Sequence, residues 1–310
     1  MMISFVLSRL LSTLVVVLGV ICMVFLLIHF IPGDPVDMML GESAQAVDRE
    51  ALREALGLNR PLGAQLWQYI VGLFQGNLGM SLHHRIPVSD LLAERLPATI
   101  ELAVAGLLVS VLIAFPLGIV AALKKGQAMD KVSMAVSMIG VSIPNFLFGP
   151  VLILFFSIWA GWFPVSGRDG WSSLVLPAMT LGTALAAVLS RMIRSTLLDV
   201  LQEDYIRTAR AKGCSRVQVV LHHALRNAML PIITLLGLQL GVLLGGAVIT
   251  ETVFSWPGIG KLMIDSINSR DYPVVQACVL LISLSYVFVN MLTDLAYAWL
   301  DPRIRLGDRS

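Results

Sequence analysis

The sequence predicts an all-α membrane protein with six transmembrane helices and a short charged loop on the cytoplasmic side. Three observations predict this class. The 310 residues are 57% hydrophobic and 14% charged, whereas a soluble domain carries roughly 25% charged residues. The apolar residues gather in runs of about 20, the length at which a helix crosses a bilayer. Lys and Arg gather between alternate runs, as in the cytoplasmic loops of membrane proteins.

Six apolar runs are candidates for transmembrane helices. They are Leu10–Ile31, Thr99–Leu123, Val132–Phe163, Leu174–Leu189, Ala228–Thr250 and Pro273–Leu300. The first follows a basic residue, as a signal peptide would, but no small-residue cleavage site follows it, so a retained helix is expected. The third is too long for one span and too short for two. Pro144 and Pro150 can kink a helix, so we expect one bent helix with an extended outer end.

The distribution of Lys and Arg predicts the orientation. With the N-terminus inside the cell, 14 of the 22 Lys and Arg residues fall in inside segments. Much of the remainder lies in one long outer loop, where charge has little influence on orientation. Both termini are therefore expected in the cytoplasm, together with the charged segment Glu203–Arg216.

The runs divide the chain into three expected parts. These are an N-terminal transmembrane helix at 1–31, an external amphipathic segment at 32–97, and a five-helix core at 98–310 that includes a cytoplasmic loop at 199–226. In the external segment, Leu52, Ala55 and Leu56 follow helical spacing. This spacing predicts short amphipathic helices lying against the outer face.

No residue pattern predicts a catalytic site, a metal site or a cofactor. The three cysteines, Cys22, Cys214 and Cys278, are far apart and odd in number, which fits neither a disulfide framework nor a metal site. The pairs His83–His84 and His222–His223 are adjacent in sequence, and adjacent helical residues do not face one another. We interpret them as polar loop residues.

A glycine-rich segment and an intramembrane carboxylate are two further candidates for a functional role. The segment Pro257–Leu262 reads PGIGKL but lacks the first glycine and the final hydroxyl of a phosphate-binding loop, so a turn after a helix is expected. Asp294 lies within the last apolar run, where an ionisable residue suggests function. Its position near the inner end favours the structural alternative, pairing with a basic helix end.

Small residues in the fifth run predict close helix packing. Gly237, Gly241 and Gly245 recur at four-residue spacing, which lets helices approach closely in lipid. The contact could lie within the chain or against a second subunit, and the glycines alone leave both open.

The charged segment reads as two capped helices. Glu203 and Asp204 suit the positive end of a helix dipole, and cations follow in the last turn. Gly213 can adopt the left-handed conformation that ends a helix. Ser215 and Gln218 then fit a capping box for a second helix. Such a projection is expected to be held by a partner, which a merely solvated loop would not need.

These residues resemble a known family. The segment EDYIRTARAKG, followed by HHALRNAMLP, is similar to the cytoplasmic "EAA" loop of ABC-importer permeases in the dipeptide/oligopeptide/nickel permease family. Ala209, Gly213 and Leu225 match the general pattern, whereas Arg207 and Thr208 replace its first two letters. The likeness extends to IPGDP, ERLPATIELA, SIPNFLFG, LPAMTLG, WPGIGKLMIDSINSRDYPVVQA and DPRIR, which are spread over nearly the whole chain.

The resemblance implies a type I ABC-importer permease of the bacterial inner membrane. Its implied partners are a second homologous permease, two ABC ATPases, an external solute-binding protein, membrane lipid and a peptide-like substrate, with no nucleic acid. The residues that it assigns to the ATPase contact are Glu203, Asp204, Tyr205, Arg207, Thr208, Ala209, Arg210, Lys212 and Gly213. Di- or oligopeptides or glutathione are the expected substrates, and nickel is the alternative. A self-sufficient secondary transporter, or a membrane scaffold, is the alternative from another class.

Overall fold

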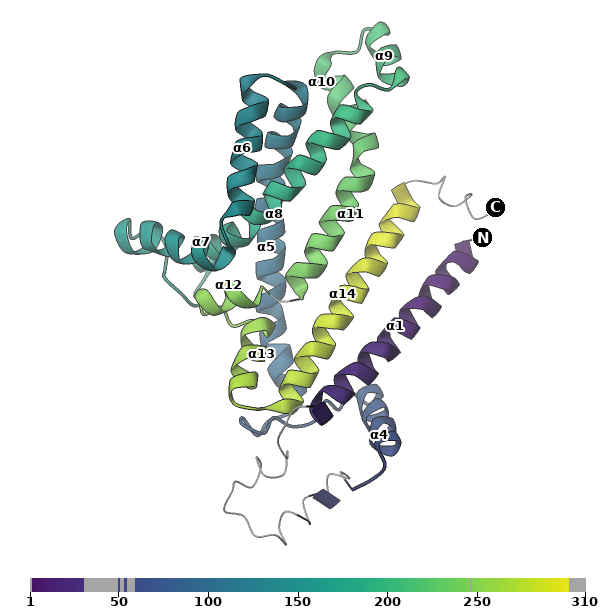
Figure 1. The fold of residues 1–310 in the computed structure, drawn as a ribbon, viewed down its shortest axis with the longest axis vertical. Coiled ribbons are helices and arrows are strands. Elements are labelled where there is room, and N and C mark those ends of the chain that lie inside the picture. Colours follow the sequence, from purple (N-terminus) through teal and green to yellow (C-terminus); the bar gives the residue numbers. More distant parts are fainter. Residues whose placement is uncertain (1, 31–49, 51–52, 55–58, 246, 301–310) are drawn as a thin grey trace.

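The computed structural model describes residues 2–30, 50, 53–54, 59–245 and 247–300. Long helices make up most of this part of the chain, and an isolated bridge between Met80 and Pro87 is its one recorded β-type pairing. The long helices are α1 (Met2–Phe30), α5 (Val88–Leu123), α8 (Trp171–Val200), α11 (Leu225–Leu244) and α14 (Tyr272–Leu300). They run roughly side by side (Figure 1), as expected for an all-α membrane protein.

Helices are present at all six predicted runs, and four or five have the properties of a span. The four that pass by length and composition are Val88–Leu123, Trp171–Val200, Arg216–Leu244 and Tyr272–Leu295, and a bent pair can supply a fifth. The apolar stretch described in α1, Leu11–Leu26, is shorter.

The third run is broken rather than gently bent. It forms α6 (Ala128–Ser142), α7 (Asn145–Leu152) and the π-helical segment η1 (Ile153–Trp159). The two parts meet at 97°. The break falls at Ile143, which is extended at φ −92° and ψ 115°, because the ring of a following proline disfavours the helical conformation. The expected kink at Pro144 is therefore confirmed, whereas Pro150 lies inside α7 without breaking it.

The start of α5 and the end of α11 differ from the bounds expected from the sequence. α5 begins at Val88 and continues through Pro97, so it crosses the boundary expected at 97–98. The fifth predicted run ends early, because α11 ends at Leu244 and the short helix α12 (Val248–Val253) follows it. α5 stays helical through Pro97, whereas α11 is followed at its C-terminal cap by Gly245, a residue with low helix propensity.

α5 and α8 form the centre of the bundle. A Cβ atom added to Gly182 of α8 would lie 2.5 Å from Cγ1 of Val109 and 2.8 Å from the carbonyl oxygen of Gly106 in α5. A Cβ at Gly118 of α5 would similarly lie 2.7 Å from Cβ of Ile193. Small residues therefore allow the two backbones to approach closely, as is common between helices in lipid.

Short elements lie at the two ends of the bundle (Figure 1). One end carries α9 (Asp204–Ala211) and α10 (Arg216–Gln218), and the other carries α12, α13 (Ile259–Asn268) and α4 (Leu62–Phe74). The π-helical segment η2 (Val219–Ala224) joins α10 to α11. The helices expected around Leu52, Ala55 and Leu56 lie outside the described residues.

Candidate functional site

The predicted two-helix loop is present. Glu203 precedes α9 in an extended conformation, Asp204 opens the helix, and Arg210 lies in its last turn. Nη1 of Arg207 lies 3.2 Å from Oδ1 of Asp204, on the exposed face of the helix. The charges therefore complement the helix dipole at both ends, as the sequence predicts.

Gly213 ends α9 in the left-handed conformation, with φ +84°. Its N–H donates to the carbonyl oxygen of Arg210 at 3.0 Å. The N–H of Cys214 donates to the carbonyl oxygen of Ala209 at 3.2 Å. This pair of bonds is the Schellman arrangement that closes a helix at a glycine. The predicted glycine stop is confirmed.

The second predicted cap is also confirmed. The side chain of Gln218 accepts from the N–H of Ser215 at 2.9 Å, and Oγ of Ser215 accepts from the N–H of Gln218 at 3.3 Å. Together these bonds form a capping box at the start of α10. The turn between the two helices is thus held from both sides.

The loop is anchored by one face of α9. Ile206 is fully buried and Ala209 nearly so, and both pack in a core with Leu197 of α8 and Val219 of η2. The Oη atom of Tyr205 accepts from Nδ2 of Asn227 at 2.6 Å. Neither Ile206 nor Asn227 was among the predicted residues, although Ile206 is the one large aliphatic residue in α9.

The remaining predicted contact residues are all exposed. They are Glu203, Asp204, Tyr205, Arg207, Thr208, Arg210, Lys212 and Gly213. Ala209 is the exception, because it is 6% exposed and faces the core. Within this group, Ala209 therefore holds the loop in place rather than presenting a surface to a partner.

Gly237 and Gly241, two of the three glycines at four-residue spacing, contact another helix of the same chain. A Cβ added to Gly237 would overlap the side chain of Thr293, and one added to Gly241 would lie 2.9 Å from Cδ2 of Tyr286. Both partners belong to α14. The sequence left open a contact within the chain or with a second subunit. In the structure these two glycines pack α11 against α14 of the same chain.

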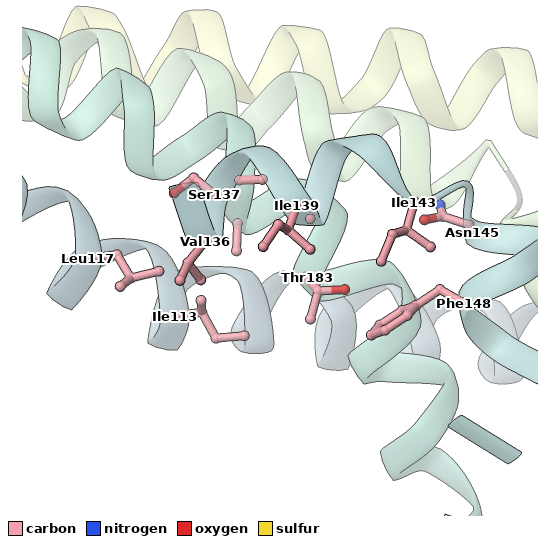
Figure 2. A pocket seen from close by; sticks show the side chains of 12 residues that line it. Ile113, Leu117, Val136, Ser137, Ile139, Ile143, Asn145, Phe148 and Thr183 are labelled. Atoms are coloured by element: carbon pink, nitrogen blue, oxygen red, sulfur yellow. The ribbon is translucent and has the colours of Figure 1, made fainter. Parts of the chain in front are cut away.

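A pocket lies beside the break between α6 and α7. It has a volume of about 260 Å³ and is mostly apolar. Its walls come from α5, α6, α7 and α8, as Figure 2 shows for Ile113, Val136, Phe148 and Thr183. Asn145, the first residue of α7, adds a polar amide to the lining. The pocket thus lies where the chain turns from α6 into α7.

At the opposite end from α9, a buried carboxylate holds a helix start. Glu251 of α12 is fully buried and accepts from Oγ1 of Thr99 at 2.9 Å and from the N–H of Lys261 at 2.9 Å. Thr99 in turn accepts from the N–H of Ile259 at 2.8 Å. Burial raises the pKa of the Glu251 carboxyl, against the opposing effect of the hydrogen bonds from Lys261 and Thr99.

This arrangement explains the PGIGKL segment. Pro257 and Gly258 form the predicted turn after α12, whereas Ile259–Leu262 already belong to α13. A Cβ added to Gly258 would overlap the Glu251 carboxylate. The Lys261 ammonium pairs with Oδ2 of Asp265 at 2.9 Å. Glu251 was not among the predicted residues, and its only signal in the sequence is a carboxylate near the end of an apolar run.

The other candidate residues do not form a site together. In the part of the chain that is described, no group of three or more His, Cys, Asp or Glu side chains could hold a metal ion. The rings of His83 and His84 pack edge to face, with their centroids 5.1 Å apart. Asp294 lies half-buried in α14, and its pairing with a basic helix end stays a prediction.

A bundle of long apolar helices that presents a capped, charged loop at one end defines a class, the multi-pass membrane proteins. The chain belongs to the family of inner membrane components of binding-protein-dependent transport systems. The family model matches residues 114–306, and the model for the N-terminal part of the same component matches residues 2–103. The chain is thus a multi-pass inner membrane protein.

Curated relatives match almost the whole chain. It is 45% identical over 304 residues to the glutathione transport system permease protein GsiC of Escherichia coli O6:H1, covering 98% of this chain and 99% of the relative. The GsiC protein of Salmonella choleraesuis is also 45% identical with the same coverage. That of Escherichia coli K12 is 44% identical, again over 98% and 99% of the two chains.

Solved structures share the fold. A chain of the MetNI methionine ABC transporter in an inward-facing conformation matches with a TM-score of 0.57 at 21% identity, covering 68% of this chain and 96% of that one. A chain of an amino acid ABC transporter matches with a TM-score of 0.55 at 14% identity, covering 68% and 94%. At these identities the likeness concerns the fold.

Proposed function

We propose that this chain is the permease subunit of an ATP-driven ABC importer for glutathione or for di- and oligopeptides. The observation that carries the proposal is the 45% identity to GsiC over 98% of this chain. The exposed loop around α9 supports it, because a subunit driven by separate ATPases needs a rigid cytoplasmic surface for them. Glutathione is itself a tripeptide, so both substrate groups share the same chemistry.

The proposed topology has six spans, with 1–31 as the N-terminal helix, 32–97 as the external segment and 98–310 as the core. The first part of α5, Val88–Pro97, then belongs to the external segment. Both termini and loop 199–226 lie in the cytoplasm. Two observations support this arrangement. The start of α1 and the end of α14 point toward the end of the bundle that carries α9 (Figure 1). The Lys and Arg distribution favours a cytoplasmic position for that end.

The proposed complex contains this permease, a second homologous permease, two ABC ATPases and an external solute-binding protein. Closure of the ATPases on ATP would push the exposed face of α9, and the permeases would open alternately to the two sides. The capped ends of α9 and its buried anchors, Ile206 and Ala209, support this role. A loop that bent under load would not transmit the movement.

Transport by the reconstituted complex tests the proposal. The complex in proteoliposomes, with the binding protein outside, is expected to take up labelled glutathione or dipeptide only when ATP is supplied. Uptake of Ni²⁺ instead would favour the nickel importers of the same family. Uptake by the single chain driven by an ion gradient would favour a secondary transporter and contradict the proposal.

A further inference from the structure

An ion pair joins α6 to α8 at the end of the bundle that carries α9. Oδ1 of Asp130 accepts from Nε of Arg194 at 2.7 Å, and Oδ2 accepts from Nη2 at 2.8 Å. Oδ2 also accepts from the N–H of Gly126 at 2.9 Å. The Asp130 side chain is 6% exposed and that of Arg194 27%. Such two-point contacts between Arg and a carboxylate fix geometry as well as adding energy.

Further contacts continue along the same two helices. The Oγ atoms of Ser137 and Ser190 lie 2.7 Å apart in a buried hydrogen bond. Nearer the break, a Cβ added to Gly140 would lie 3.1 Å from the carbonyl oxygen of Thr183. The ion pair, the hydroxyl pair and this close approach follow one another along the seam. α6 therefore cannot slide along α8 without breaking specific contacts.

The same part of α8 supports the exposed loop. Ile193 directly precedes Arg194, and Leu197 follows it by three residues. Both belong to the buried core that includes Ile206 and Ala209 of α9. One turn of α8 thus shares a buried core with α9 and also holds the first turn of α6 through Arg194. The chain also leads from the end of α8 into α9 through only three residues, 201–203, so α8 is joined directly to the loop.

We propose that Asp130 and Arg194 are positioning residues that make α6 move with α8, so that a displacement of α9 reaches the pocket at the α6–α7 break. This inference rests on the proposed function. A buried ion pair adds little net stability compared with apolar residues of similar size. The two hydrogen bonds between Asp130 and Arg194 instead hold α6 in register with α8, the helix that receives the movement.

The test separates coupling from folding. Asp130→Asn removes the charge that Arg194 needs, and the double variant Asp130→Leu with Arg194→Met replaces the pair by apolar contact. Glu101→Gln is the matched control, because it breaks an ion pair with Arg168 (2.7 Å) whose side chains are both 37% exposed. Uptake, ATP hydrolysis and retention of the ATPase subunits are measured on equal amounts of reconstituted complex.

Both pair variants are expected to retain the ATPases and to hydrolyse ATP. The ATP consumed per imported substrate molecule should rise about tenfold or more, the range of a lost coupling between sites, while the control stays unchanged. An unchanged ratio in both pair variants would overturn the proposal. So would loss of the ATPases together with uptake, since the pair would then only hold the loop. Failure of the unaltered complex to import with ATP would contradict the proposed function instead.

Discussion

The hydroxyl of Thr99 joins two distant parts of the chain by donating to the Glu251 carboxylate at 2.9 Å while accepting from the N–H of Ile259 at 2.8 Å. The indole Nε1 of Trp256 reinforces this contact with a 2.8 Å bond to the carbonyl oxygen of Ala98. α5 is thereby fixed to the turn between α12 and α13. The side chains of Thr99, Glu251 and Trp256 are all buried.

Thr99→Val should weaken this junction without changing the volume of the side chain. The buried N–H of Ile259 and one oxygen of Glu251 would each lose a partner, at a cost of about 1–3 kcal/mol per group. A lower thermal unfolding temperature of the purified protein is the expected result. Thr252→Val is the control, since Thr252 is exposed and bonds only within its own helix. Equal melting of both variants would contradict the role of the junction.

Gly237→Val should separate α11 from α14. The new side chain would overlap Thr293, and overpacking of a close contact costs typically about 1–3 kcal/mol. Gly19→Val is the matched helical control, because nothing lies within 4 Å of a Cβ at Gly19. Reduced stability in detergent is expected for the first variant alone. A stable Gly237→Val protein would show that α14 moves aside freely.

Gly213→Val should weaken the hold of the ATPases on the loop. A side chain in the left-handed region costs roughly 1–2 kcal/mol, and the Schellman closure of α9 would be strained, although no atom lies within 4 Å of the new Cβ. Gly76, at φ +74° and equally open, provides the control Gly76→Val near α4. Co-purification of ATPases should fall for Gly213→Val alone. Normal retention and uptake in that variant would remove the basis for the docking surface.

The proposed orientation is open to a direct test. Reporter fusions after Lys125 and after Arg216 are expected to read as cytoplasmic, and fusions near Arg168 and Asp265 as external. The basis is the excess of Lys and Arg in the segments assigned to the inside. An external signal at Arg216 would invert the architecture and place the loop beyond the reach of cytoplasmic ATPases.

The sequence by itself determined the helical class, the positions of the apolar runs and the two capped ends of the charged loop. Each of these depends on residues close together in the chain. Gly213 and the Ser215–Gln218 pair act within one or two turns, so their signals could be recognised locally. The break before Pro144 is local for the same reason.

Tertiary structure alone decided which residues meet across the bundle. Gly237 and Gly241 could have served a second subunit, and only the position of α14 settled their partner. Pro97 remains inside α5 although its local preference favours a helix end. Asp130 and Arg194, like Thr99 and Glu251, are joined over long stretches of chain. Such contacts depend on how the helices pack, because burial and geometry, rather than sequence spacing, decide which polar groups become partners.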